Sequence, residues 1–270
     1  MINGTRLSWR EEGSGEPILF VHAFPFQSGF WDQQLISLPP GWRAIAPDLR
    51  GFGRSAGSGS GPYTMDLFAD DLVGLLDHLD LKQAVIFGLS MGGYVAFSLY
   101  RRYRARARAL ILCSTRPGAD SEEGRKNRAA LAARVRTDGI RAVIDTMLPK
   151  LLSEHTIATQ PDLVNFVQQL MQSNQPETIA RALEGMAMRE DSEDMLRTID
   201  VPTLIIHGEE DAIIPPGEAQ LMARGIRGAR IKVLPQVGHL INLEMHSEFN
   251  RFLRDFLAQL PPSWDQLKFA

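Results

Sequence analysis

Seven short apolar runs, separated by segments with helical periodicity, constrain the fold of this chain more than any other feature of its sequence. Several of the runs are continuously apolar, which is typical of strands buried on both faces of a parallel sheet. In chain order the runs are TRLSWR, PILFVH, RAIAPD, AVIFG, ALILC, TLIIHG and RIKVLP. This alternation predicts an α/β fold in which helices cover both sides of a mostly parallel central sheet.

The strand signal is interrupted between Cys113 and Val201, where the sequence has a helical composition throughout. A helical segment of this length between two core strands is typical of an inserted cap. We therefore expect an α/β core formed by residues 1–115 and 200–270, with a helical cap over residues 116–199.

Several helix and loop boundaries follow from local patterns. Thr64 is placed to cap a helix whose apolar positions recur at helical spacing. Asp120 with Glu123 resembles a second N-terminal cap. The stretch SAGSGSGP, residues 55–62, predicts a mobile loop. Prolines are expected to interrupt the helices of the cap at Pro149, Pro161 and Pro176.

Composition excludes several functional classes. The 270 residues carry a formal net charge of −3, which provides no electrostatic footprint for nucleic acid or for an anionic membrane. The five arginines of RRYRARARAL, residues 101–110, are interpreted as the solvated end of a helix and its turn. Cys113 is the only cysteine, so no intramolecular disulfide can form, and it is expected to be a buried apolar residue.

Targeting and membrane signals are also missing from the sequence. The polar N-terminus has no apolar signal region, and no apolar run approaches the roughly 18 residues that span a bilayer. We therefore expect a cytoplasmic protein with neither nucleic-acid nor membrane partners. The oligomeric state stays open.

The sequence GLSMG, residues 88–92, fits the pattern G-x-S-x-G between a predicted strand and a predicted helix. In this context the pattern forms a sharp turn that exposes a nucleophilic serine, here Ser90. Glycines two positions before and after the serine relieve the crowding of the turn, and Gly93 lets the helix pack on the strand. The pattern equally fits a small residue in a tight turn, so the partners of Ser90 must decide its role.

A serine nucleophile needs a base, and the base needs an acid that orients it. For this motif the chain order is serine, acid and histidine, with the last two on loops after later strands. Asp211 follows TLIIHG and His239 follows RIKVLP, as that order predicts. Glu209 and Glu210 are alternative acids, but the place of Asp211 just before AIIPP favours it.

Backbone N–H groups are expected to stabilise the oxyanion that forms when the serine attacks a carbonyl. One is the N–H of Met91, which follows Ser90 at a helix N-terminus. The second comes from the loop after PILFVH, where Pro25 has no N–H and Phe24 is the better donor. His22 is expected to brace this loop.

The remaining patterns predict no cofactor and no metal. GFGRSA, residues 51–56, matches a dinucleotide-binding pattern, but a Gly/Ser-rich loop follows it in place of a helix N-terminus. None of the six histidines has a metal-ligand spacing such as H-E-x-x-H. His207 is interpreted as a packed histidine at a strand end, and His246 as a surface residue.

Together these residues resemble the α/β-hydrolase superfamily, and within it the small, cap-bearing bacterial carboxylesterases with their cofactor-free haloperoxidase and enol-lactonase relatives. Relatives typically carry His-Gly where this chain has His22-Ala23, and a positive φ there would strain alanine. Haloalkane dehalogenases and related epoxide hydrolases carry aspartate at the position of Ser90, which disfavours both chemistries. The resemblance covers nearly the whole chain through HAFPF, PDLRGFGRS, GLSMGG, GEEDAIIP and VGHLINLE.

The resemblance implies a cofactor-free serine hydrolase that cleaves small to medium, mostly apolar carboxylic esters through an acyl-enzyme formed on Ser90. Enol-lactonase, perhydrolase or haloperoxidase activity with the same triad is an alternative, and so is a ligand-binding signalling protein with slow turnover. At least half of the candidate pocket residues are expected to pack the core of the cap instead of lining the pocket. The candidates that complete the pocket are Phe26, Trp31, Met147, Leu148, Leu151, Leu152 and Phe166.

Overall fold

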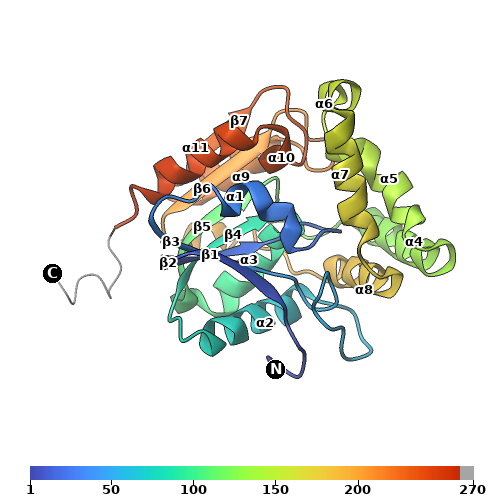
Figure 1. Ribbon diagram of the computed structural model, residues 1–270, viewed down its shortest axis with the longest axis horizontal. Helices are drawn as coiled ribbons and strands as arrows, with labels where there is room; N and C mark the ends of the chain where they lie inside the picture. The colour runs from blue at the N-terminus through green and yellow to red at the C-terminus, as the bar shows by residue number, and fades with distance from the viewer. Residues whose placement is uncertain (262–270) are drawn as a thin grey trace.

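A single seven-stranded sheet, ordered β1-β3-β2-β4-β5-β6-β7, runs through the computed structural model, which describes residues 1–261. Only β1 is antiparallel to its neighbour, and the other adjacent strands are parallel (Figure 1). The predicted α/β class with a mostly parallel sheet is confirmed. The strands are β1 (Trp9–Gly13), β2 (Gly15–Val21), β3 (Gly41–Pro47), β4 (Ala84–Leu89), β5 (Ala107–Cys113), β6 (Thr203–Gly208) and β7 (Arg230–Leu234).

The central strands bury apolar side chains on both faces of the sheet. In β4, Ile86 packs in one apolar cluster, whereas Val85 and Phe87 pack in the other, because successive side chains of a strand point to opposite faces. One face is covered by α2 (Met65–His78), α3 (Met91–Arg102) and α9 (Gly217–Gly225). The other is covered by α1 (Asp32–Leu35), α10 (Ile241–Glu244) and α11 (His246–Leu257), as Figure 1 shows for α2 and α11 on opposite sides of the sheet.

The first helix of the core begins where its local signal predicts, whereas the first strand does not. Thr64 Oγ1 accepts a hydrogen bond of 3.1 Å from Leu67 N–H and caps α2 as predicted. The first predicted strand overlaps β1 only at Trp9 and Arg10, since β1 continues through polar, mostly exposed residues. An edge strand paired only with β3 needs no alternating apolar face, so its sequence gives a weak signal.

Between β5 and β6 the chain forms the expected helices, and residues 114–202 contain no strand. Figure 1 shows α4, α5, α6 and α7 grouped at one end of the sheet, with α8 beneath them. Pro161 and Pro176 begin α7 and α8 as expected, but Pro149 lies inside the last turn of α5 and does not interrupt it. The helices are α4 (Glu122–Asp138), α5 (Arg141–Leu151), α6 (Glu154–Thr159), α7 (Pro161–Gln172) and α8 (Pro176–Ala187).

The residue that caps α4 differs from the predicted one. Ser121 Oγ accepts a hydrogen bond of 3.1 Å from Gly124 N–H, whereas the Asp120 carboxylate is buried and paired with arginines. Burial alone would raise the pKa of Asp120, but Arg128 and Arg189 hold it below its usual value. The carboxylate therefore joins the segments before α4 and after α8 to α4 itself, and it does not cap the first turn of the helix. Its partners are Arg116, Arg128 and Arg189.

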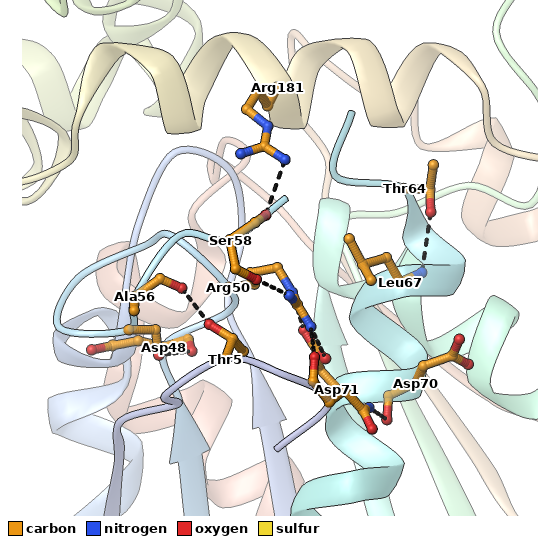
Figure 2. A network of polar contacts seen from close by, with 12 residues as sticks. Thr5, Asp48, Arg50, Ala56, Ser58, Thr64, Leu67, Asp70, Asp71 and Arg181 are labelled. Carbon is orange, nitrogen blue, oxygen red and sulfur yellow. Dashed lines mark hydrogen bonds and ion pairs between the residues drawn. The ribbon is translucent and has the colours of Figure 1, made fainter. Parts of the chain in front are cut away.

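The glycine- and serine-rich stretch 55–62 is tethered, in contrast to the mobile loop that its composition predicts. Figure 2 shows Ser58 between Arg50 and Arg181 of α8. The Ser58 carbonyl accepts from Arg181 at 3.2 Å, and Arg50 also forms a buried ion pair with Asp71 of α2 at 2.5 Å. Arg181 further donates to the Gly61 carbonyl at 2.6 Å. Two buried guanidinium groups thus hold the loop against both core and cap.

The arginines of residues 101–110 are paired with acidic side chains on neighbouring elements. Arg102 lies 2.7 Å from Asp70, and Arg108 lies 2.8 Å from Glu16. Among the helices of the described residues, none combines the length and the apolar character that a bilayer span requires.

Candidate active site

Ser90 occupies a strained turn between β4 and α3. Its backbone has φ 56° and ψ −114°, a left-handed conformation that side-chain-bearing residues rarely adopt. A Cβ on Gly88 would lie 2.2 Å from the Gly92 carbonyl oxygen, and one on Gly92 would lie 2.1 Å from the Val21 carbonyl oxygen. The glycines around Ser90 are therefore required by the close approach of neighbouring backbone. The turn is held by Ser90 N–H, which donates to the Cys113 carbonyl at 2.9 Å.

Asp211 and His239 meet in a buried pair beyond the ends of β6 and β7. His239 Nδ1 lies 2.8 Å from Asp211 Oδ2, and both residues are almost completely buried. The other carboxylate oxygen accepts from the N–H groups of Ile213 and Ile214, each at 2.9 Å. The pair leaves His239 Nε2 as the ring nitrogen that is free to act on a hydroxyl.

The environment of Asp211 favours its ionised form. Burial alone would raise the pKa of the carboxyl, but His239, His207 and the backbone N–H of Ile214 outweigh it and hold the pKa well below its usual range. Glu209 and Glu210, the alternative acids, are both exposed.

His207 contacts the site in a way that its sequence position alone does not reveal. It is fully buried as predicted, and its Nε2 lies 2.8 Å from the Ile214 carbonyl oxygen and 3.3 Å from Asp211 Oδ2. Because a carbonyl oxygen can only accept a hydrogen bond, Nε2 of His207 must carry the proton. This N–H therefore faces both the Ile214 carbonyl and the Asp211 carboxylate. The available signal was its place four residues before Asp211 at the end of a strand.

In the loop of residues 23–26, which follows β2, hydrogen bonds fix the orientation of the peptide group between Ala23 and Phe24. The Ala23 carbonyl accepts from Phe26 N–H at 2.9 Å and from His22 Nδ1 at 3.0 Å. His22 Nε2 in turn accepts from Leu49 N–H at 3.0 Å. Since a trans peptide N–H points away from its carbonyl, these bonds also aim the N–H of Phe24.

The prediction that His22 braces this loop is therefore confirmed, and its imidazole does so in the neutral form. Burial lowers the pKa of His22 to about 4, against the opposing effects of the Ala23 carbonyl and Asp48. Ala23 does not have a positive φ, so alanine is accommodated without backbone strain in place of the typical glycine.

Met91 is the first residue of α3 and lies next to Ser90. The N–H groups of Gly93 and Tyr94 donate to the Ser90 carbonyl at 2.9 and 3.3 Å. The N–H of Met91 is one of those that a helix start leaves without an intrahelical acceptor. It is thus available to an oxyanion that forms on a substrate bound at Ser90.

The predicted pocket residues separate into two groups. Trp31 is fully buried in the core, with ring centroids 5.4 Å from Phe20 and 4.7 Å from Phe87 on the sheet. Phe26 is also fully buried and stacks on Phe30 at 4.9 Å. Both side chains pack in the core on one face of the sheet, and their assignment to the pocket lining stays a prediction.

The other pocket candidates belong to the cap, and two of them lie against the loop of His239. The Leu151 carbonyl accepts from Leu240 N–H at 3.0 Å. A Cβ on Gly238 would lie 2.7 Å from the carbonyl carbon of Leu152. The remaining three are partly buried in the same apolar cluster, and they are Met147, Leu148 and Phe166.

The fold agrees with a comparison against known families. A family model described as alpha/beta hydrolase fold matches residues 16–245. The chain belongs to the α/β-hydrolase family. The predicted resemblance is confirmed, and membership of this family supports a hydrolase as the broad functional class.

Relatives of this α/β-hydrolase match most of its length. A non-heme haloperoxidase from Rhodococcus erythropolis is 32% identical over 88% of this chain and 90% of its own. The structure of a thermophilic esterase from Thermogutta terrifontis with malate bound has a TM-score of 0.92 and 41% identity, over 95% of this chain and 94% of that one. The enol-lactonase structure from Burkholderia xenovorans LB400 has a TM-score of 0.88 and 29% identity, over 96% and 98% of the two chains.

Proposed function

We propose that this α/β-hydrolase is a serine esterase that acts on small to medium, mostly apolar carboxylic esters. The observation that carries the proposal is the buried Asp211–His239 pair at 2.8 Å, combined with the strained turn that presents Ser90. A likeness at a TM-score of 0.92 to a thermophilic esterase supports the same chemistry. The proposed partner is therefore a small-molecule ester, and the proposed compartment is the cytoplasm.

In the first half of the proposed reaction, His239 Nε2 removes the proton of Ser90 Oγ as the oxygen attacks the ester carbonyl. The N–H groups of Met91 and Phe24 donate to the oxyanion of the tetrahedral intermediate. Asp211 stays ionised and stabilises the imidazolium, because its pKa is held well below the usual range. The imidazolium then protonates the leaving oxygen as its bond to the former carbonyl carbon breaks, so that the alcohol departs and the acyl group remains on Ser90.

In the second half, water replaces the alcohol. His239 takes a proton from the water, the hydroxide attacks the acyl carbonyl, and the same N–H groups stabilise the second oxyanion. Proton return to Ser90 Oγ releases the carboxylic acid. Every step uses protein groups and water alone.

A cyclic ester is the second candidate substrate. The likeness to the enol-lactonase structure at a TM-score of 0.88 favours it. In a lactone the leaving oxygen remains attached to the acyl group, so the proposed steps apply unchanged. A haloperoxidase or perhydrolase reaction would instead require a peroxide to replace water in the second half.

Covalent labelling and turnover together test the esterase proposal. We expect a fluorophosphonate probe to label Ser90, and p-nitrophenyl esters of two to eight carbons to be hydrolysed by the native protein but not by Ser90→Ala. Ser114 is the matched control, since it is a fully buried serine at the next strand end, also at positive φ. Ser114→Ala should retain both signals. Equal ester turnover in the native protein and Ser90→Ala would refute the proposal and favour a ligand-binding role.

A further inference from the structure

One side chain of the cap bridges two segments of the core. Asn174 lies between α7 and α8 and is 4% exposed. Its Nδ2 donates to the Pro25 carbonyl at 2.8 Å, and its Oδ1 accepts from Gly53 N–H at 3.0 Å. A single amide group therefore joins the cap to the 23–26 loop and to the segment that follows β3.

The two contacts require a side chain that both donates and accepts. The Pro25 carbonyl can only accept and Gly53 N–H can only donate, so the orientation of the Asn174 amide is determined by its partners. A carboxylate of the same shape would keep the bond to Gly53 but would place an oxygen against the Pro25 carbonyl. A leucine would remove both bonds and would leave the buried Pro25 carbonyl without this partner.

The 23–26 loop is thus held from two sides. The core holds the Ala23 carbonyl through His22 and the Phe26 N–H, as described above. The cap holds the Pro25 carbonyl through Asn174. The N–H of Phe24 belongs to the same peptide group as the Ala23 carbonyl, and the Pro25 carbonyl follows two peptide groups later. A shift at Pro25 is therefore transmitted to the Phe24 N–H through a short stretch of backbone.

We propose that Asn174 is a positioning residue through which the cap aims the N–H of Phe24 at the oxyanion. The proposal rests on the proposed esterase function of Ser90. It assigns the cap a part in the chemical step in addition to any contact with substrate. An oxyanion donor acts mainly in the transition state, so a loosened loop lowers kcat while leaving KM nearly unchanged.

Thr178 provides a matched control in the same region of the cap. Its Oγ1 donates to the Gly51 carbonyl at 3.0 Å, so it ties α8 to the segment that Asn174 also contacts. Its hydroxyl forms this bond with Gly51 and none with the 23–26 loop in the described part of the chain. Thr178→Val therefore removes a comparable bond between cap and core without changing the hold on the Pro25 carbonyl.

The experiment compares p-nitrophenyl butyrate kinetics and melting temperatures of the native protein, Asn174→Asp, Asn174→Leu, Thr178→Val and Ser90→Ala. Removal of a whole oxyanion donor lowers kcat by about 100- to 1,000-fold, so we expect a loosened donor to lower it by about 10-fold in both Asn174 variants. KM should stay within about threefold, and Thr178→Val should keep kcat within about twofold.

The affinity of a trifluoromethyl ketone is a second measurement, because this inhibitor forms a tetrahedral adduct with the serine. If Asn174 served only the stability of the fold, this affinity would not change. The affinity should fall in parallel with kcat in the Asn174 variants and stay unchanged in Thr178→Val. If Asn174→Leu does not fold, the isosteric Asn174→Asp decides.

Three results have distinct meanings. If the native protein is active and the Asn174 variants keep its kcat, the positioning proposal is overturned and the esterase proposal stands. An equal loss of kcat in Thr178→Val also overturns it, because the effect would then follow general loosening of the cap. A native protein without serine-dependent activity refutes the proposed function itself, and the positioning proposal with it.

Discussion

Replacing Asp211 by asparagine should abolish nearly all ester hydrolysis while preserving the fold. One carboxylate oxygen accepts from the N–H groups of Ile213 and Ile214, each at 2.9 Å. The carbonyl oxygen of asparagine must take that place, because both partners are donors. The NH₂ group then takes the place of Oδ2, which lies 2.8 Å from His239 Nδ1 and 3.3 Å from His207 Nε2.

In this arrangement an N–H group faces His239 Nδ1, so Nδ1 must be unprotonated and the ring proton moves to Nε2. The nitrogen that should receive the proton of Ser90 is then blocked. The same tautomer change in a serine triad lowers kcat by about 10⁴-fold. At about 1.36 kcal/mol for each factor of ten, the barrier rises by about 5 kcal/mol.

The assay is p-nitrophenyl butyrate hydrolysis at pH 7.5, accompanied by circular dichroism and a thermal melt to show that the variant is folded. Glu210→Gln is the matched control, since Glu210 is an exposed acid next to Asp211 and should be replaceable with less than a twofold change in kcat. A folded Asp211→Asn variant with kcat reduced less than tenfold would refute the tautomer argument. A severe loss in Glu210→Gln would move the role of the acid to that residue.

Two further predictions concern stability. Burial lowers the pKa of His22 to about 4 in the folded protein against about 6.5 in the unfolded chain, so stability should fall as the pH falls between these values. Urea unfolding at pH 7 and 4.5 should show a drop about 2 kcal/mol smaller in His22→Gln than in the native protein, and equal drops would contradict the assignment. A Cβ on Gly185 would lie 1.7 Å from the Tyr63 carbonyl oxygen, so Gly185→Ala should destabilise the protein by at least about 2 kcal/mol in a thermal melt. Gly61→Ala, with no atom near its new Cβ, should melt within about 1 °C of the native protein, and similar melts for both variants would contradict the close packing of α8 on the core.

Much of the architecture is encoded locally. The continuously apolar runs predicted the strands because a strand in a parallel sheet buries both faces, and this leaves its mark within a few residues. The turn at Ser90 is also encoded locally, because the backbone around it leaves no room for a Cβ at Gly88 or Gly92. The chain order of Ser90, Asp211 and His239 could be used because the strand ends of a parallel sheet meet at one edge.

Other features depend on partners that are far apart in the sequence. Asp120 has the local pattern of a helix cap, but three arginines bind its carboxylate and Ser121 caps the helix instead. The stretch 55–62 has the composition of a mobile loop, but Arg50 and Arg181 hold it. Local propensity was overridden in both places by a buried charge that needed partners.

By itself, then, the sequence determined the strands after β1, the place where a serine could be presented, and the acid and histidine that could serve it. Each of these is recorded in a few neighbouring residues. Only the tertiary structure decided that His207 shares its proton with Asp211 and that Trp31 fills the sheet core. It alone brought Asn174 to the Pro25 carbonyl across 149 residues of chain. A hydrogen bond of this kind depends on how cap and core pack, and no local periodicity or propensity records that packing.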